Sequence, residues 1–127
     1  MPSSESHQDP SDSQHRGAGV VVDLETEASA VLSEAKAAPN GRATRTLTKE
    51  GHLRMVLLAL QSGAVLAEHS AAGPLGIDVI RGEAVVEAEG ASYELSGKRT
   101  LILDARVVHA VTAKSDCVIR LVIAMPG

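Results

Sequence analysis

The chain has 127 residues, of which 44% are hydrophobic and 22% charged, and its formal net charge is -4. Its one aromatic residue is Tyr93, so it lacks the paired aromatic side chains on which single-stranded bases stack. The acidic balance also offers no basic surface to a phosphate backbone. These features predict a single domain with no nucleic-acid partner.

The longest dense apolar run, residues 55–60, is far shorter than the ~20 residues that a membrane span needs. The N-terminus also lacks the basic and apolar blocks of a secretory signal. The single cysteine, Cys117, cannot form an internal disulfide, which is typical of a reducing compartment. We therefore expect a cytoplasmic protein with no membrane partner.

Residues 1–19 are polar, and we predict a disordered N-terminal tail. Residues 20–42 are predicted to form an N-terminal helix and linker. The helix is expected over 23–37, with Asp23 as its N-cap, apolar residues at helical spacing and a stop at residues 39–41. Its apolar stripe is narrow and rich in alanine, so we expect it on the outside of the main body or against a partner subunit.

Beyond residue 42 the pattern changes to short segments rich in Val, Ile, Leu and Thr, separated by glycine-containing turns. Many short strands with regular turn signals predict an all-β sandwich or barrel over residues 43–127. The predicted strands are 43–48, 53–60, 64–69, 75–81, 83–89, 91–95, 100–103, 107–113 and 117–124.

Charged residues in these strands are interpreted as solvated. Arg42, Arg45 and Lys49 are expected on an exposed edge strand that resists aggregation. Arg120 is expected either to face outward or to pair with a carboxylate on a neighbouring strand.

The sequence has no glycine-rich phosphate loop, no cysteine pair at zinc spacing and no nucleophile elbow. Cys117 lies in an apolar strand and is interpreted as a small core residue. The remaining candidates for chemistry are His69 and His109, which end or interrupt apolar strands.

The surroundings of these histidines resemble the two motifs of the cupin superfamily. Residues 63–82 resemble the first motif, with Gly63, His69 and Gly82 in place, and residues 97–113 resemble the second, with His109 in place. The resemblance covers residues 43–127 and is strongest to small single-domain bacterial cupins. It implies a cupin-type double-stranded β-helix, that is, a jelly-roll barrel, and a homodimer.

Members of the superfamily that use a metal typically hold it with three histidines and one glutamate. In this chain the second histidine of the motif is replaced by Ala71 and the glutamate by Leu75. The second motif departs at Asp104, Arg106 and Ala113. The resemblance therefore implies His69 and His109 as the retained ligands of one divalent metal (Zn, Fe, Mn, Ni or Cu), bound weakly, or no cofactor at all.

Strand alternation places Leu75, Ile77 and Val79 on one face and Asp78 on the other. With Val107, these residues are predicted to line a small apolar cavity that has the two histidines at one end. His52 lies in a predicted turn, and its spacing does not require it at the site.

Three functions follow from this pattern. The first is a barrel that binds a small, mostly apolar molecule through His69 and His109, with no committed reaction. The second is a metal-dependent enzyme of the oxygenase, isomerase or hydrolase type that uses the same histidines as partial ligands, or a metal-free acid–base variant. The third is an interaction protein in which Ile80 and the helix contribute to a dimer contact.

Overall fold

The computed structural model describes residues 18–126. Within them, one helix, α2 (Leu24–Ala37), is followed by nine strands. These are β1 (Arg42–Thr48), β2 (Leu53–Leu60), β3 (Val65–His69), β4 (Leu75–Arg81), β5 (Ala84–Ala88), β6 (Ala91–Leu95), β7 (Thr100–Leu103), β8 (His109–Ala113) and β9 (Cys117–Ala124). Each predicted strand is present, with ends within two residues of the prediction. The tail predicted over 1–19 lies, except for residues 18 and 19, outside the described residues.

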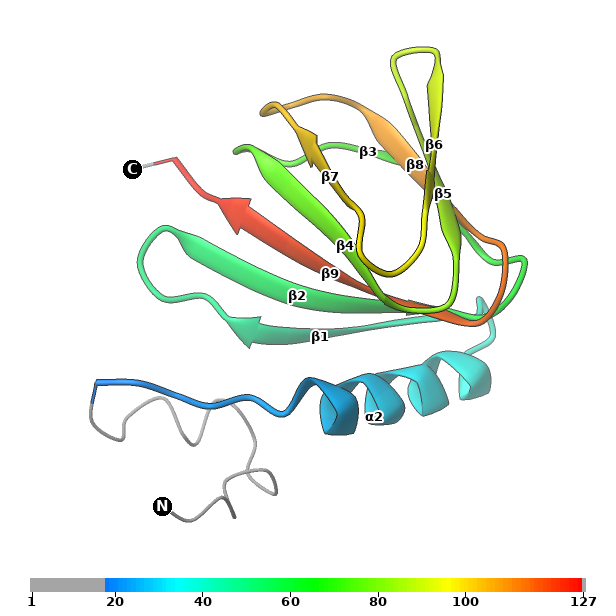
Figure 1. The fold of residues 1–127 in the computed structure, drawn as a ribbon, viewed down its shortest axis with the longest axis horizontal. Helices are drawn as coiled ribbons and strands as arrows, with labels where there is room; N and C mark the ends of the chain where they lie inside the picture. Colours follow the sequence, from blue (N-terminus) through cyan, green and yellow to red (C-terminus); the bar gives the residue numbers. More distant parts are fainter. Residues whose placement is uncertain (1–17, 127) are drawn as a thin grey trace.

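The strands form two antiparallel sheets that pack face to face (Figure 1). One sheet has the order β1-β2-β9-β4-β7 and the other the order β3-β8-β5-β6. Strands far apart in sequence are therefore neighbours, as β9 is between β2 and β4. This order is that of a jelly roll, which confirms the predicted all-β jelly-roll class. In the part of the chain that the structure describes, no helix is long and apolar enough to cross a membrane.

The main core lies between the two sheets and is aliphatic. Leu75, Ile77 and Val79 point into it from β4, as strand alternation predicts. They meet Val86 and Val111 from the other sheet within the same cluster. With no aromatic side chain in this cluster, the barrel interior consists of short branched side chains.

The helix α2 covers the outer face of the larger sheet (Figure 1). Asp23 caps it by accepting a hydrogen bond from the Thr26 N–H at 3.2 Å, and the helix ends just before Pro39. Its buried face, Ala28, Val31, Leu32 and Ala35, packs against Leu47, Leu57, Ala59 and Val118. The helix was expected either on the outside of the main body or against a partner subunit, and it lies on the outside of its own barrel.

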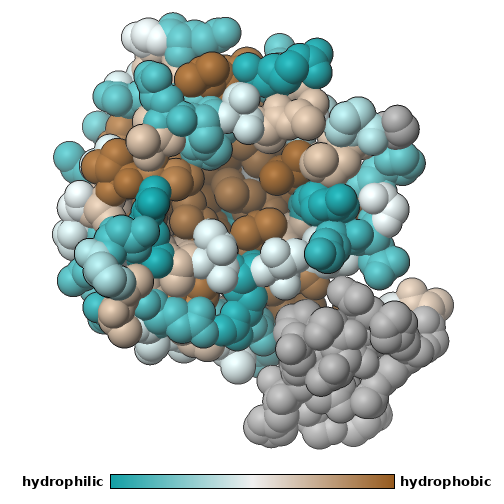
Figure 2. All heavy atoms as spheres, turned by 180° about the vertical axis from the view of Figure 1, so that it is seen from behind, coloured by the Kyte–Doolittle hydropathy of each residue, from teal (hydrophilic) through white to brown (hydrophobic). Residues whose placement is uncertain are grey.

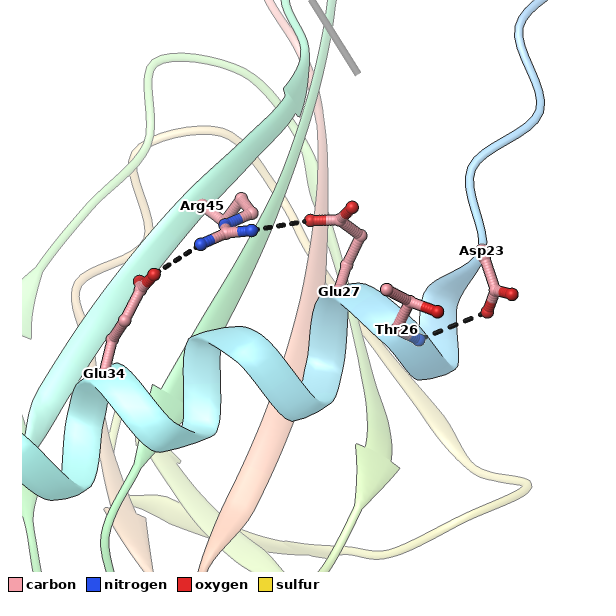
Figure 3. Close-up of polar contacts among 5 residues, drawn as sticks. All are labelled: Asp23, Thr26, Glu27, Glu34 and Arg45. Atoms are coloured by element: carbon pink, nitrogen blue, oxygen red, sulfur yellow. Dashed lines mark hydrogen bonds and ion pairs between the residues drawn. The ribbon is translucent and has the colours of Figure 1, made fainter. Parts of the chain in front are cut away.

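β1 is an edge strand as expected, but Arg45 on it is not a solvated charge. Its guanidinium lies between two carboxylates of the helix, Glu27 at 2.9 Å and Glu34 (Figure 3). Glu27 is only 7% exposed, so this ion pair fastens the helix to β1. Ile80 packs, partly buried, against the same helix and sheet cluster, and its part in a dimer contact stays a prediction.

At one end of the barrel, the chain crosses between the sheets through two loops. Residues 70–74 join β3 to β4, and residues 104–108 join β7 to β8. The two loops are tied together by a hydrogen bond from the Arg106 N–H to the Ala71 carbonyl at 2.8 Å. The C-terminal residues lie at this end too, where the Met125 N–H donates to the His52 carbonyl at 2.6 Å.

Candidate functional site

The structure brings His69 and His109 together at this end of the barrel. His69 is the last residue of β3, His109 is the first residue of β8, and the two face each other in register. Their ring centroids are 4.1 Å apart, with the ring planes tilted by 57°. Two residues forty positions apart in sequence thus form one imidazole pair.

Backbone carbonyls fix the tautomer of both rings. Nδ1 of His69 lies 3.0 Å from the Ala67 carbonyl oxygen, and Nδ1 of His109 lies 3.0 Å from the Val107 carbonyl oxygen. Because a carbonyl oxygen can only accept, each Nδ1 carries the proton and donates. In a neutral imidazole the other nitrogen, Nε2, is then left as an acceptor.

The Nε2 atom of His109 is a buried acceptor. His109 is 2% exposed, and within residues 18–126 no group donates a hydrogen bond to this atom. Burial is the main cause that lowers the pKa of His109; the neighbouring His69 lowers it further, and the bond to Val107 opposes both. The ring is therefore held neutral, and Nε2 of His109 is a buried acceptor to which no described residue donates.

The wall beside the pair is made of small side chains. His109 is paired on its other side with Ala88, which is in turn paired with Ala91 on β6. Paired residues share a face of the sheet, so these two methyl groups continue the row of His69 and His109. Across this row of the sheet, the side chains change in size from two imidazoles to two methyl groups.

The inner wall is open to solvent on the side of β2, β9 and β3. There the inner-facing residues are partly exposed, whereas Ile77 and Ile119 deeper in the barrel are 0% exposed. Seen from behind, apolar residues gather in a recess ringed by hydrophilic ones (Figure 2). We define the mouth as the partly exposed inner-facing residues of these three strands, which are Arg54, Val56, Leu66, His69, Leu121 and Ile123.

No protein-family model and no curated protein matches the chain. Solved structures do. A cupin superfamily protein from Desulfitobacterium hafniense is 18% identical with a TM-score of 0.65, covering 72% of this chain and 87% of its own. A conserved Streptococcus pyogenes protein of unknown function is 22% identical with a TM-score of 0.64, over 71% of this chain and 79% of its own. The salicylate 1,2-dioxygenase of Pseudaminobacter salicylatoxidans is 17% identical with a TM-score of 0.66, covering 76% of this chain, which spans 32% of that enzyme.

The chain has the cupin fold. The resemblance that the two sequence motifs predicted is confirmed at the level of architecture, on structures with little sequence identity. The similarity to these neighbours establishes the barrel fold, and the function has to be inferred from the residues of this chain.

The donor set of this barrel does not fit a tightly held metal ion. A catalytic first-row metal normally takes about three protein ligands. Within the described residues no group of three or more His, Cys, Asp or Glu side chains is placed to hold one. Leu75, at the motif position of the glutamate, is 4% exposed and packs in the core. His69 and His109 together supply two nitrogen atoms.

The other residues predicted to bind a ligand occupy different depths of the cupin barrel. Leu75, Ile77 and Val79 are 4%, 0% and 5% exposed, so they form the packed floor beneath the mouth. Val107 lies in the loop before β8 and not in a strand as expected, because β8 starts at His109. Its carbonyl orients His109. That these four residues contact a ligand stays a prediction. His52 is exposed in the turn between β1 and β2.

Sequence reasoning missed Arg54 as a member of this site. Leu58 and Leu60 belong to the inner core cluster, and alternation from them along β2 puts Val56 and Arg54 on the same face. The signal was therefore present in the spacing, but the register of β2 against β9 was needed to read it.

Proposed function

We propose that this cupin barrel binds a small, mostly apolar organic molecule in its mouth, with the polar end of the molecule against His69 and His109 and one hydroxyl or N–H group donating to Nε2 of His109. The observation that carries the proposal is the Nε2 atom of His109, a buried acceptor without a donor next to a second imidazole. The apolar residues around it supply contact area, while the two rings set the orientation of the ligand.

The energetic argument concerns that buried acceptor. A buried polar group left without a partner costs roughly 1–3 kcal/mol. A ligand that brings a donor removes this cost and buries its own apolar part against Leu121 and Ile123 at the same time. A purely apolar molecule would leave the cost in place, so the site favours a ligand with one donor at the end of an apolar body.

The second candidate is a metal-dependent cupin enzyme in which His69 and His109 are partial ligands of a divalent ion. The observation in its favour is that both Nδ1 atoms are held by carbonyls, while neither Nε2 atom has a partner within the described part of the chain, as in metal-ligating histidines. Two nitrogen ligands place this function second.

The test uses the full chain without a histidine tag, labelled with ¹⁵N. Imidazole nitrogen resonances are followed during titration with 4-ethylphenol, a neutral apolar molecule with one hydroxyl donor. We expect a saturable shift of the Nε2 signals of His69 and His109 and none for His52, which is exposed in a turn. His109→Gln, checked for folding by circular dichroism, should weaken the binding at least fivefold.

A titration with Zn²⁺ and Ni²⁺ under the same conditions separates the two candidates. Sub-micromolar, stoichiometric metal binding that shifts both histidines would overturn the metal-free proposal in favour of the second candidate. No saturable response of either histidine to 4-ethylphenol would overturn the proposal as well. Shifts with 4-ethylphenol and only weak metal binding would support it.

We also propose that the protein acts as a homodimer in the cytoplasm. The outer face of β4 and β7 lies beyond the helix, which contacts β1, β2 and β9. Ile102 on this face is 73% exposed and lies in one row with Gly76 and Val122. We place the contact with the second copy on this row, which the helix leaves uncovered.

A further inference from the structure

Arg54 lies on the inner wall of the barrel, in the same terminal row as the start of β4. Arg54 is paired with Ile123 across β2 and β9, and Ile123 is paired with Leu75 across β9 and β4. Because paired residues share a face and Leu75 belongs to the inner core cluster, the Arg54 side chain leaves the strand on the inner side. It is partly exposed, as expected at the rim of the mouth.

Arg54 is the one charged residue on the inner face of β2, β9, β4 and β7, while the edge strand β1 carries Arg42 opposite the inner-facing Leu60. The other inner-facing positions of β2, β9, β4 and β7, all of which the structure describes, carry aliphatic side chains or Cys117. Within residues 18–126 no carboxylate lies within 4.0 Å of Arg54, and the same holds for Arg42, Arg99 and Arg106, whereas Arg45, Arg81 and Arg120 each have an acidic partner.

The guanidinium of Arg54 has most of its hydrogen-bonding capacity free. Its Nη1 atom lies 3.5 Å from the Gly51 carbonyl and 3.4 Å from the Leu53 carbonyl. These are long distances for N–H···O bonds, and among residues 18–126 the remaining donors of the planar fork have no hydrogen-bond partner. The contacts place the guanidinium beside the β1–β2 turn, where it meets solvent.

Arg54 and the histidine pair lie at the same end of the barrel. β3 ends at His69, and the chain reaches Leu75, in the row of Arg54, after the short loop 70–74. Facing sheets pack about 10 Å apart, a span that a single aromatic or branched aliphatic molecule covers. One ligand can therefore meet the guanidinium at the rim and the imidazoles on the opposite wall.

We infer that the ligand is an organic acid, specifically a small hydroxycarboxylate whose carboxylate pairs with Arg54 and whose hydroxyl lies against the histidine pair and donates to Nε2 of His109. The inference rests on the proposed function and adds the chemical class of the molecule. A carboxylate matches the guanidinium fork through two parallel hydrogen bonds and keeps its charge near solvent. The protein carries a formal net charge of -4, so a preference for anions would arise from this residue and not from the overall field.

The test compares acids with their neutral amides on the same full-length protein. The probes are 4-hydroxybenzoate, 4-hydroxyphenylacetate and 3-(4-hydroxyphenyl)propionate, each paired with its carboxamide, and dissociation constants come from the imidazole ¹⁵N titration. For the acid of matching length, we expect roughly tenfold tighter binding than for its amide, as for a charge-assisted hydrogen bond. Raising the salt concentration should reduce this preference.

Arg54→Gln is the decisive variant, and Arg106→Gln is its matched control. Arg106 is an exposed arginine in the loop 104–108 at the same end of the barrel, without an inner-wall position. Arg54→Gln should abolish the preference, so that acid and amide bind with equal affinity, while Arg106→Gln should keep the preference.

Equal affinity for acid and amide, or an acid preference that survives Arg54→Gln, would overturn the inference. If 4-ethylphenol binds the histidines in that case, the proposed function stands and only the acid assignment fails. If neither 4-ethylphenol nor any acid shifts the histidine resonances, both fail together.

Discussion

Gly82 gives a prediction in which the structure separates two physical effects. This glycine ends the first cupin-like motif, has φ +82° and follows β4. A Cβ atom added there would lie 2.2 Å from the Asp116 carbonyl oxygen and 2.9 Å from Cys117 Cβ. Gly90 has almost the same backbone conformation, φ +80°, but a Cβ atom there would have no heavy atom within 4 Å. Gly82→Ala therefore adds a collision to backbone strain, and Gly90→Ala adds strain alone.

The magnitudes follow from these distances. A left-handed conformation costs an alanine about 1–2 kcal/mol, and the lower entropy of the unfolded chain offsets about 0.4–1 kcal/mol of that. Gly90→Ala should therefore lower the free energy of unfolding by about 1 kcal/mol or less. At Gly82 the backbone segments must move apart by roughly 1 Å, and overpacking adds about 1–3 kcal/mol. The movement also disturbs Asp116, whose carboxylate accepts from the Ser62 N–H at 2.8 Å.

The assay is urea unfolding followed by far-UV circular dichroism, because the chain has no tryptophan to report by fluorescence. Both variants should keep the wild-type dependence on denaturant and differ in midpoint, with Gly82→Ala the less stable by about 1–3 kcal/mol. Equal losses in the two variants would refute the reasoning, because the cost would then come from φ alone.

Three further predictions use the same unfolding assay or simple hydrodynamics. Burial lowers the pKa of His109 in the folded chain, so the unfolded chain takes up a proton at a higher pH than the folded chain does. The free energy of unfolding should therefore fall as the pH drops below 6.5. This dependence on pH should be weaker in His109→Gln, and an unchanged dependence would contradict the prediction. Arg45→Met leaves the buried Glu27 carboxylate without its partner and should cost about 1–3 kcal/mol, whereas Arg81→Met, whose partner Glu25 is exposed, should cost under about 1 kcal/mol. Light scattering should give the mass of a dimer for the wild type and of a monomer for Ile102→Glu; a monomeric wild type would exclude the proposed dimer.

The positions of the helix and the strands could be predicted because their signals are local. Asp23 and the helical spacing after it set the start and the buried face of α2, and short β-branched segments between glycine turns set the strands. The largest difference, the start of β8 at His109 and not at 107, arises because Val107 closes the loop that orients the histidine. Such boundaries depend on the partner strand, which lies elsewhere in the sequence.

The histidine pair shows the limit of that local reasoning. Leu66 and His69 are three positions apart, so strict alternation along β3 would place them on opposite faces of the sheet. A register shift between them adds one residue on β3, and both therefore reach the inner face, opposite Val111 and His109. The motif resemblance, and not the periodicity, placed His69 in the barrel, and the bulge supplies its physical cause.

The amino-acid sequence by itself determined an all-β barrel with an aliphatic interior, one capped helix and two histidines as candidates for its chemistry, since these follow from composition, spacing and turn residues. Only the tertiary structure decided that the helix is fastened to its own barrel through Arg45, that His109 is buried with a free Nε2, and that Arg54 faces the same mouth. The reason is physical: these features depend on pairing between strands distant in sequence, and a shift of one position in that pairing reverses which side chains point inward.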